Sequence, residues 1–484
     1  MMNTDKLEPI AASPDTSRGS PSVRGALVSL SLSVLLSSLG TSIANVALPN
    51  FAEAFDASFQ AVQWVVLAYL LAITTLIVSV GRIGDLLGRK RLLLTGVFLF
   101  ALASVLCGLA PTLWWLIGAR ALQGLGAAIM MALAMAFVAE TVPKATTGRA
   151  IGLLGTMSAI GTALGPSLGG LLITGYGWPA IFLINLPLGL ITLVLTWRYL
   201  PRDHALKRAE RPSFDIAGTV LLALALAAYA LAMTLGRGHF GTLNAALLLL
   251  AALIIGFFVR VESRTDAPLV RLSLFHNGML SASLAMSTLV STVMMATLVV
   301  GPFYLSRALG LDAALVGLAM SAGPLVAALT AAPAGRLADR FGTQGVTRLG
   351  LVGMAGGASA LSILPASMGI AGYITPLLII TAGYALFQTA NNTAVMKDVS
   401  PDHRGVVSAM LNLSRNLGFV TGASVMGAVF ALATASTDIA SAPPESVARG
   451  MQATFAVAVI LVVIALAIAA STYRNSARNR GLVS

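Results

Sequence analysis

Two arginines lie inside long stretches of sequence that otherwise carry no charge. Arg120 falls within residues 113–138, and Arg415 falls within residues 405–432. An arginine in such apolar surroundings is costly unless it is paired or faces water, so each is a candidate for binding a ligand or for helping to move a proton. For Arg120 the alternative is a structural role, in which backbone carbonyl groups satisfy the guanidinium.

Uncharged polar side chains in other apolar stretches are candidates to line the same binding site. Such residues usually face protein or water, although many of them only join helices through hydrogen bonds. Trp64 and Tyr69 can alternatively anchor a helix at the membrane surface or pack as aromatic side chains. The candidates are Asn45, Gln63, Trp64, Tyr69, Gln388, Asn391, Asn392, Asn412 and Asn416.

The residue types that enzymes need are not arranged for catalysis. The sequence has no G-x-x-x-x-G-K-[ST] phosphate-binding loop and no H-E-x-x-H or similar cluster of metal ligands. All four histidines fall in predicted loops, so no Ser/His/Asp arrangement is plausible, and the single cysteine, Cys107, excludes a disulfide framework. We therefore predict that the protein is not an enzyme and that it binds neither a cofactor nor a metal.

Membrane-spanning helices must position these candidate residues. The chain is 57% hydrophobic and only 10% charged, whereas soluble proteins contain about 25% charged residues. An apolar run of about 20 residues is long enough to cross the hydrocarbon core as a helix. We count 14 such runs, at residues 26–48, 61–80, 92–110, 113–138, 150–174, 179–197, 216–235, 242–259, 279–300, 313–333, 349–365, 371–394, 405–432 and 451–472.

The distribution of the 30 basic residues predicts how these helices are oriented. If the N-terminus is cytoplasmic, the two tails and the even-numbered loops contain 25 of them, and the odd-numbered loops contain only Arg237, Arg307 and Arg449. Lysine and arginine in short loops remain on the cytoplasmic side. We therefore expect both termini in the cytoplasm, and we attribute the net charge of +12 to topology and not to a nucleic-acid partner.

An internal repeat divides the chain into two halves. AGRLADRFGTQ (334–344) repeats the pattern of GRIGDLLGRKR (81–91) at an offset of 254 residues, and VGPFYL (300–305) corresponds to VALPNF (46–51). In membrane proteins built from such repeats, the ligand site lies at the interface between the halves.

The repeat predicts five segments. They are a disordered cytoplasmic tail (1–25), an N-terminal six-helix bundle (26–197), linkers with an inserted two-helix hairpin (198–278), a C-terminal six-helix bundle (279–472) and a basic cytoplasmic tail (473–484). We assign no chemistry to the two basic linkers that flank the hairpin.

The repeated loop combines glycine with charge between the second and third spans. Its glycines permit a tight turn, and Asp85 lies where it can interact with the N-terminus of the third span and with Arg82 or Arg89. The pattern G-R-x-G-D-x-x-G-R-K-R is similar to the signature loop of the major facilitator superfamily. This resemblance implies that the loop and its second copy latch the two halves in one conformation. The latch residues are Gly81, Arg82, Asp85, Gly88, Arg89, Gly335, Arg336, Asp339 and Gly342.

Two further stretches resemble motifs of that superfamily. RALQGLGAA (120–128) is similar to its second motif, and Gln123 therefore joins Arg120 as a candidate for proton coupling or for the substrate cavity. GTALGPSLGG (161–170) resembles the motif of the antiporter branches. Its small residues permit close packing of helices, although a generic small-residue interface would show the same pattern. The residues of this motif are Gly161, Gly165, Pro166, Gly169 and Gly170.

The resemblance covers nearly the whole chain and, with 14 spans, points to the drug/proton antiporter branch. It implies an all-α integral membrane protein with the major facilitator fold, in which two six-helix bundles are joined by an inserted helix pair. The implied function is multidrug efflux, the secondary active export of small amphipathic organic substrates in exchange for protons, which confers drug resistance. We expect a monomer surrounded by membrane lipids in a bacterial-type cytoplasmic (inner) membrane.

One departure from the family pattern changes the expected substrates. In LGTSIANVALP, Gly40 stands where many members have an aspartate that is implicated in binding cations or protons. Without it no acidic residue lies deep in any span, whereas Arg120 and Arg415 would give the cavity a positive potential. We therefore expect neutral or anionic substrates in preference to dicationic ones. The proton would then be carried by Asp85, by Glu140 or by a protonatable substrate.

Two other functions remain as alternatives. A proton-coupled symporter that imports an organic solute would use the same scaffold, although the antiporter-like motif favours export. A membrane enzyme or a receptor without transport activity has no support in the sequence, because neither a catalytic constellation nor a sizeable soluble domain is present.

Overall fold

The computed structural model describes most of the chain, with short gaps. The description of residues 81, 82, 85, 139, 140, 148, 404, 405 and 473–481 is limited to the backbone. In the described part of the chain, 14 helices are long and apolar enough to cross a membrane. This confirms the predicted all-α membrane fold with 14 spans. The described residues are 23–77, 79–142, 147–201, 203, 215–235, 241–265, 268, 275–397, 399, 404–435 and 442–481.

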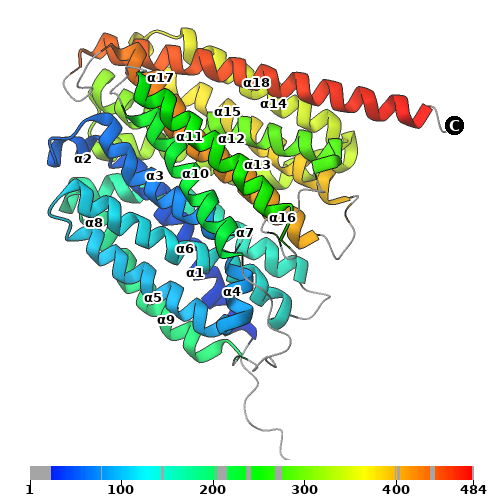
Figure 1. The fold of residues 1–484 in the computed structure, drawn as a ribbon. Helices are drawn as coiled ribbons and strands as arrows, with labels where there is room; N and C mark the ends of the chain where they lie inside the picture. Colours follow the sequence, from blue (N-terminus) through cyan, green and yellow to red (C-terminus); the bar gives the residue numbers. More distant parts are fainter. Residues whose placement is uncertain are drawn as a thin grey trace, which may run out of the picture.

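The N-terminal half provides six of these spans. Its helices are α1 (Val23–Val46), α2 (Leu48–Ala54), α3 (Phe59–Leu76), α4 (Val80–Leu87), α5 (Arg89–Gly108), α6 (Leu113–Thr141), α7 (Thr147–Tyr176), α8 (Ala180–Leu183) and α9 (Asn185–Tyr199). The short helices α2 and α4 follow α1 and α3, and α8 leads into α9. This half, coloured blue to cyan-green, lies below the other half in Figure 1.

The C-terminal half provides six further spans. Its elements are α12 (Gly278–Phe303), η4 (Tyr304–Ala308), α13 (Ala313–Phe341), α14 (Thr343–Ile363), η5 (Ala366–Met368), α15 (Gly369–Lys397), α16 (Arg404–Thr421), η7 (Gly422–Met426), α17 (Gly427–Thr434) and α18 (Pro444–Gly481). The last helix continues to Gly481, so part of the predicted C-terminal tail is helical. The remaining two spans form the inserted hairpin, α10 (Ile216–Thr234) and α11 (Thr242–Glu262).

The two copies of the repeated loop turn at equivalent residues. Gly88, between α4 and α5, has a φ of 96°, and Gly342, between α13 and α14, has a φ of 79°. Glycine is favoured in this left-handed region because any other residue would bring a Cβ atom too close to the backbone. The two glycines, 254 residues apart, thus adopt the same backbone conformation, and the expected tight turn is present in both halves.

The two halves pack tightly together at one end of the molecule, which we call the closed end. Here α1, α7 and α12 finish and α3 and α13 begin. The ring of Phe59, at the start of α3, lies 4.8 Å from that of Phe303 in α12 and 5.2 Å from that of Phe430 in α17, measured between ring centroids. Aromatic pairs at these separations are stabilising beyond the area that they bury.

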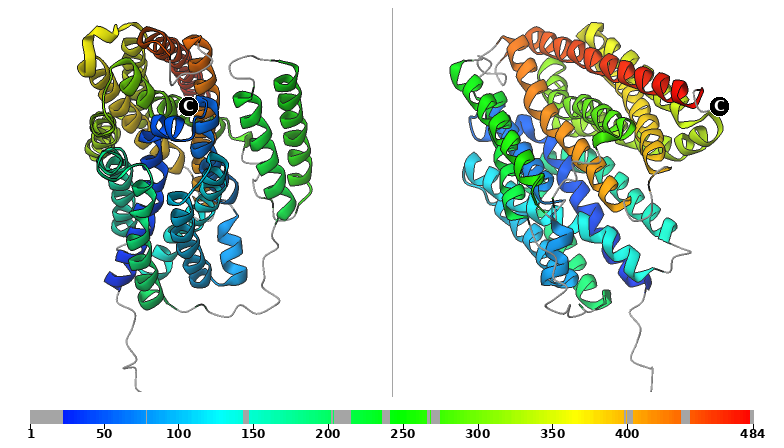
Figure 2. Two further views of the ribbon diagram at one scale, coloured as in Figure 1. Left: turned by 90° about the vertical axis from the view of Figure 1, so that its left-hand side faces the viewer. Right: turned by 45° about the vertical axis from the view of Figure 1, so that its right-hand side comes forward.

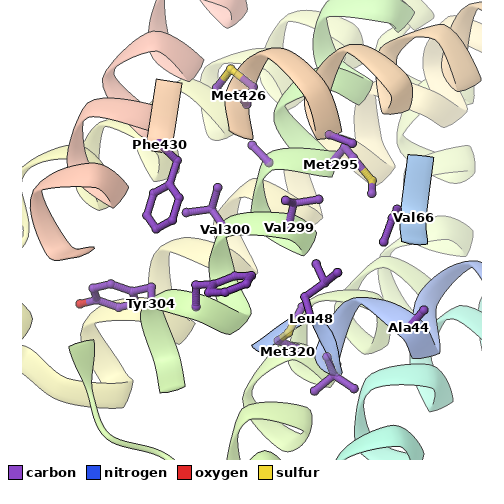
Figure 3. Packing of buried hydrophobic residues seen from close by; sticks show 14 of the residues in the cluster. Ala44, Leu48, Val66, Met295, Val299, Val300, Tyr304, Met320, Met426 and Phe430 are labelled. Atoms are coloured by element: carbon purple, nitrogen blue, oxygen red, sulfur yellow. The ribbon is translucent and has the colours of Figure 1, made fainter. Parts of the chain in front are cut away.

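Buried aliphatic side chains extend this contact away from the end. In Figure 3, Leu48 of α2 lies beside Met320 of α13, and Val66 of α3 faces the side chains of α12. These residues belong to a single hydrophobic cluster that includes members of both halves. Apolar burial and aromatic packing thus hold the closed end together.

The inserted hairpin bridges the two halves along one flank. Figure 2 shows α10 and α11, in green, on one side of the bundles. The indole Nε1–H of Trp64 in α3 donates a hydrogen bond to Thr234 Oγ1 (3.1 Å), and the hydroxyl of Tyr229 donates one to Thr421 Oγ1 (3.2 Å) in α16. Because α3 and α16 belong to different halves, α10 covers the seam between them.

We predict that a disulfide can join the hairpin to the N-terminal half. The hydroxyl oxygens of Ser79 and Thr219 lie 3.0 Å apart, so cysteines at both positions would be close enough to form a disulfide. The double variant Ser79→Cys/Thr219→Cys, with Cys107→Ala, should cross-link under mild oxidation, detected by mass spectrometry. Pairing Ser79→Cys with Leu224→Cys, an exposed position on α10, is the control. Equal cross-linking in both pairs, or none in the first, would contradict this docking.

Candidate functional site

A cavity of about 420 Å³ lies between the two halves. Helices α1, α3, α6 and α7 form its wall on one side, and α12, α13, α15 and α16 form it on the other. Gly155, Ala331 and Asn392 are exposed residues of this wall, near the start of α7 and the last turns of α13 and α15. The cavity therefore extends toward the end of the molecule opposite the closed end, which we call the open end.

The wall of the cavity is mainly apolar. Met294, Met295, Met320 and Phe419 provide flexible and aromatic surface on the side of the C-terminal half. Methionine adapts to ligands of different shape because its side chain is unbranched and polarisable. Hydroxyl groups line the side of the N-terminal half, from Ser38, Thr41, Ser42, Ser158 and Thr162. This combination suits an amphipathic organic molecule.

Four of the predicted site residues lie in this wall, and one of them is Asn416 of α16. Gln388 and Asn392 reach it from α15, and Arg415 reaches it from α16. The side-chain amide of Gln388 donates a hydrogen bond to the hydroxyl of Tyr384 (2.9 Å), which also lines the cavity. The guanidinium of Arg415 donates a hydrogen bond to Asn412 Oδ1 (2.7 Å). No acidic residue appears among the described residues of the wall.

Arg120 and Gln123 lie away from the cavity, inside the N-terminal half. Arg120 is fully buried, and its Nε–H donates to the carbonyl oxygen of Val65 (3.0 Å) while Nη1 donates to Gln123 Oε1 (2.5 Å). The amide of Gln123 in turn donates to Ser104 Oγ (2.7 Å). The guanidinium also lies 4.1 Å from the ring centroid of Tyr69. These contacts match the structural alternative for Arg120, because α3, α5 and α6 are joined through it.

Asn45, Trp64 and Tyr69 also lie away from the wall of the cavity. The amide of Asn45 donates to the carbonyl oxygen of Thr41 (3.0 Å) within α1. The hydroxyl of Tyr69 donates to the carbonyl oxygen of Ser37 (2.8 Å), and Trp64 contacts the inserted hairpin as described above. In this conformation Trp64 and Tyr69 connect helices, as polar residues in membrane proteins often do, whereas Asn45 bonds to the backbone of its own helix.

Gly40, where many family members have an acid, faces the interior of the N-terminal half. A Cβ atom at this position would lie 3.1 Å from the hydroxyl of Tyr69 and 3.1 Å from the Phe100 ring. A side chain here would point toward Tyr69, whose ring lies against Arg120, and not into the cavity. In this conformation, even an aspartate at position 40 would not add a charge to the cavity wall, because its side chain would point into the N-terminal half.

The antiporter-type motif packs α7 against α1. A Cβ atom at Gly161 would meet the carbonyl oxygen of Leu35, and one at Gly165 would overlap with Ser42 Oγ. At Gly169 the added atom would lie 2.8 Å from a methyl carbon of Val46. The spacing of these glycines therefore reflects close helix packing along most of α7.

The same motif also packs α7 against the other half. A Cβ atom at Gly170 would overlap with the carbonyl oxygen of Ala313 in α13, and one at Gly317 would overlap with that of Pro166. The backbones of α7 and α13 thus touch at the closed end, which is possible only because Gly170 and Gly317 lack side chains.

A charge pair at the closed end joins repeat-related residues that the sequence analysis did not select. The guanidinium of Arg307 in η4 forms an ion pair with the carboxylate of Glu53 in α2. The two residues are 254 positions apart, which is the offset of the repeat. Glu53 in the N-terminal half and Arg307 in the C-terminal half are therefore equivalent positions. The sequence contained this signal, because the aligned segments 46–51 and 300–305 end two residues before the pair.

The latch loop is contacted by an acidic residue of the linker that follows α9, to which the sequence analysis assigned no chemistry. Asp203, after α9, accepts hydrogen bonds from the backbone N–H groups of Lys90 (2.7 Å) and Arg91 (3.1 Å). Asp203 therefore interacts with the N-terminus of α5, where its charge is favourable. This contact is structural and was not predicted, because nothing in the sequence of the linker shows that Asp203 reaches α5.

The other latch residues are placed as follows. The side chains of Arg82 and Asp85, like that of Glu140, lie outside the described residues, so their interactions stay predictions. Arg336 and Asp339 are exposed near the end of α13. The remaining members are the glycines at 81, 88, 335 and 342, together with the half-buried Arg89.

We predict that Gly170→Val separates the halves at the closed end. The added side chain would overlap with the backbone of α13, and overpacking of this kind costs about 1–3 kcal/mol. Spin labels at Asp56 and Leu315 should move apart by several ångströms, measured by double electron–electron resonance in a Cys107→Ala background. Gly175→Val is the matched control, because a Cβ atom at Gly175 has no neighbour within 4 Å. An unchanged distance in the first variant would contradict the packing.

We predict that neutralising Glu53 or Arg307 weakens the closed end, and that exchanging them restores it. The Glu53 side chain is 58% exposed, so the pair contributes roughly 0.2–1 kcal/mol. Glu53→Gln and Arg307→Gln should each broaden the Asp56–Leu315 distance distribution, while the double exchange Glu53→Arg/Arg307→Glu should narrow it again. Glu445→Gln, an exposed acid at the start of α18, is the control. Failure of the exchange to restore the distribution would argue against a direct pair.

Comparisons with known proteins agree with this architecture. Residues 30–423 match the Major Facilitator Superfamily. The chain is 31% identical to the riboflavin transporter RibZ of Clostridioides difficile, over 84% of this chain and 88% of the relative. It is 32% identical to the multidrug resistance protein Stp of Mycobacterium tuberculosis, over 87% and 79%, and 32% identical to the drug efflux pump JefA of the same species, over 89% and 85%.

Solved structures share the fold at lower identity. A bacterial homologue of the human lysosomal transporter Spinster, in an inward-facing conformation, aligns with a TM-score of 0.67 and 17% identity over 93% of this chain and 97% of the other. A D-xylose–proton symporter aligns with a TM-score of 0.67 and 14% identity over 92% and 97%. The family match spans most of the chain, and the relatives and structural neighbours are transporters. The chain therefore belongs to the Major Facilitator Superfamily and is a transporter, not an enzyme.

Proposed function

We propose that this protein exports amphipathic organic compounds across the cytoplasmic membrane in exchange for protons. The observation that supports this proposal most is the cavity between the halves, whose methionine-rich apolar wall also carries hydroxyl and amide groups. Such a wall binds molecules by shape and apolar contact and tolerates several substrates. Relatives named as drug efflux pumps at about one-third identity point the same way.

The end toward which the cavity extends supports an inward-facing state, in which the substrate site is open to the cytoplasm. The distribution of basic residues assigns the even-numbered loops and both termini to the cytoplasm. The open end of the cavity lies on the side of the even-numbered loops, and the closed end lies on the side of Arg307. The protein, as a monomer, would therefore collect substrates from the cytoplasm or from the inner leaflet of the membrane.

Export then requires the closed end to open while the open end closes. The contacts that must break are the ring cluster of Phe59, the Glu53–Arg307 pair and the backbone contact of Gly170 with α13. The latch loops, which turn at Gly88 and Gly342, lie at the opposite end and would hold the state in which the cytoplasmic ends are together. The two halves would thus rock around the cavity.

We propose that no carboxylate in the cavity wall carries the proton. The described wall contains no Asp or Glu, and the family's acidic position is Gly40. The proton would move on acidic residues near the ends of the helices, such as Asp85 or Glu140, or on the substrate itself. A wall without acidic groups favours neutral or anionic substrates over dications.

Import of an organic solute by proton symport is the second candidate. The riboflavin transporter RibZ, whose name states no direction, is as similar to this chain as the efflux pumps are. The same scaffold and the same cavity would serve either direction.

We predict that everted membrane vesicles take up uncharged or anionic probes when their interior is acidic. Proton exchange would drive riboflavin, as an uncharged fluorescent probe, into the vesicles, and a protonophore should abolish this uptake. Dequalinium, a dication, should be taken up no faster than in vesicles without the protein. Uptake only when the exterior is acidic would support symport instead. Efficient uptake of the dication and not of riboflavin would contradict the proposed substrate class.

A further inference from the structure

Arg415 is isolated among the residues that surround the cavity. It is the single residue with a formal charge at neutral pH among the described residues of the wall. The described part of the chain places no carboxylate within ion-pair distance of it. A cation that is partly removed from water and has no counter-charge is costly. An anionic group on a ligand would supply the missing partner.

The hydrogen bonds of Arg415 hold its guanidinium in place and leave donors free. The amide of Asn412 donates to the carbonyl oxygen of Ser408 (3.0 Å), which orients the Asn412 oxygen toward Arg415. One Nη group of Arg415 donates to this oxygen, and its buried Nε–H has no partner. A guanidinium offers five N–H groups in a planar fork that matches a carboxylate or a sulfonate.

Apolar surface lies beside this charge. Phe419 follows Arg415 by four residues on α16, so both lie on the same face of the helix and both line the cavity. Met294 and Met295 of α12 also line the cavity. A ligand with an acidic group and an apolar body would therefore satisfy both parts of the wall.

The opposite half offers no second charge. A Cβ atom at Gly418 would meet Thr288 and Ser291 of α12, as one at Gly161 would meet Leu35 and Ser38 of α1, so these two glycines correspond in the two halves. Arg415, three residues before Gly418, therefore corresponds to Ser158, and Thr162 also lines the cavity there. The repeat is therefore asymmetric at the substrate site, with one cation on one side and hydroxyl groups on the other. This asymmetry suits a ligand with a single acidic group.

We propose that Arg415 is the specificity-determining anchor for amphipathic organic acids, with Asn412 as the residue that positions it. This inference rests on the proposed function, because it takes the cavity as the substrate site. The substrate class becomes a planar or apolar body with one carboxylate or sulfonate. Neutral molecules of the same shape would bind without the anchor and more weakly.

The test compares two probes that differ in one charge. A fluorescent coumarin carboxylate and its carboxamide are titrated against the purified full-length protein in detergent. Losing a hydrogen-bonded charge contact reduces affinity by about tenfold or more. Arg415→Gln should therefore weaken binding of the carboxylate by that factor and change binding of the carboxamide by less than about twofold, while Arg415→Lys gives an intermediate loss. Arg449→Gln removes the same charge from an exposed site and should change neither.

Each outcome separates this inference from the proposed function. The proposed role of Arg415 would be contradicted if Arg415→Gln bound the carboxylate with unchanged affinity. It would also be contradicted if Arg415→Gln lost equal affinity for both probes while Arg415→Lys bound both with normal affinity. Binding of the carboxamide but not of the carboxylate by the wild type would also overturn it and would leave export of neutral compounds standing. Lack of binding of either probe to the wild type, together with no proton-driven uptake of riboflavin, would overturn the proposed function and the anchor with it. Retained carboxamide binding shows that Arg415→Gln is folded.

Discussion

The approach of α7 to α13 at the closed end is the contact on which the arrangement of the two halves depends. Gly170, Pro166, Gly317 and Ala313 bring two helix backbones together at a point where no side chain would fit. Because the halves meet there and diverge toward the other end, a cavity of about 420 Å³ remains between them. Small residues are the usual means of such close approach in membranes, where apolar burial gives little preference for protein over lipid.

Charge is distributed so that this contact can be made and broken. The closed end uses ring packing and the partly exposed Glu53–Arg307 pair, whose strength is modest. The fully buried cation, Arg120, lies within one half and is bonded to Val65 and Gln123, so its contacts need not change when the halves move. Arg415 differs from Arg120 because it lies in the wall of the cavity between the halves.

The sequence predicted the fold well because uncharged runs, basic loops and the repeat are each dictated by the membrane. The glycine turns at 88 and 342 and the packing role of Gly161–Gly170 were also predictable from residue type and spacing. The position of side chains around each helix was not. Arg120, Tyr69 and Asn45 have the polarity of cavity residues, but helix rotation turns them into the N-terminal half. Asp203 was missed because its role depends on where a linker returns to the bundle.

The central claim is that the two halves rock about the cavity, and paired distances at both ends test it most directly. One pair of spin labels, at Asp56 and Leu315, reports the closed end, and a second pair, at Leu153 and Ala332, reports the open end; all four residues are exposed. In reconstituted membranes, a change of pH or addition of riboflavin should lengthen one distance and shorten the other in the same sample. Distances that stay constant, or that change in the same direction, would contradict the account.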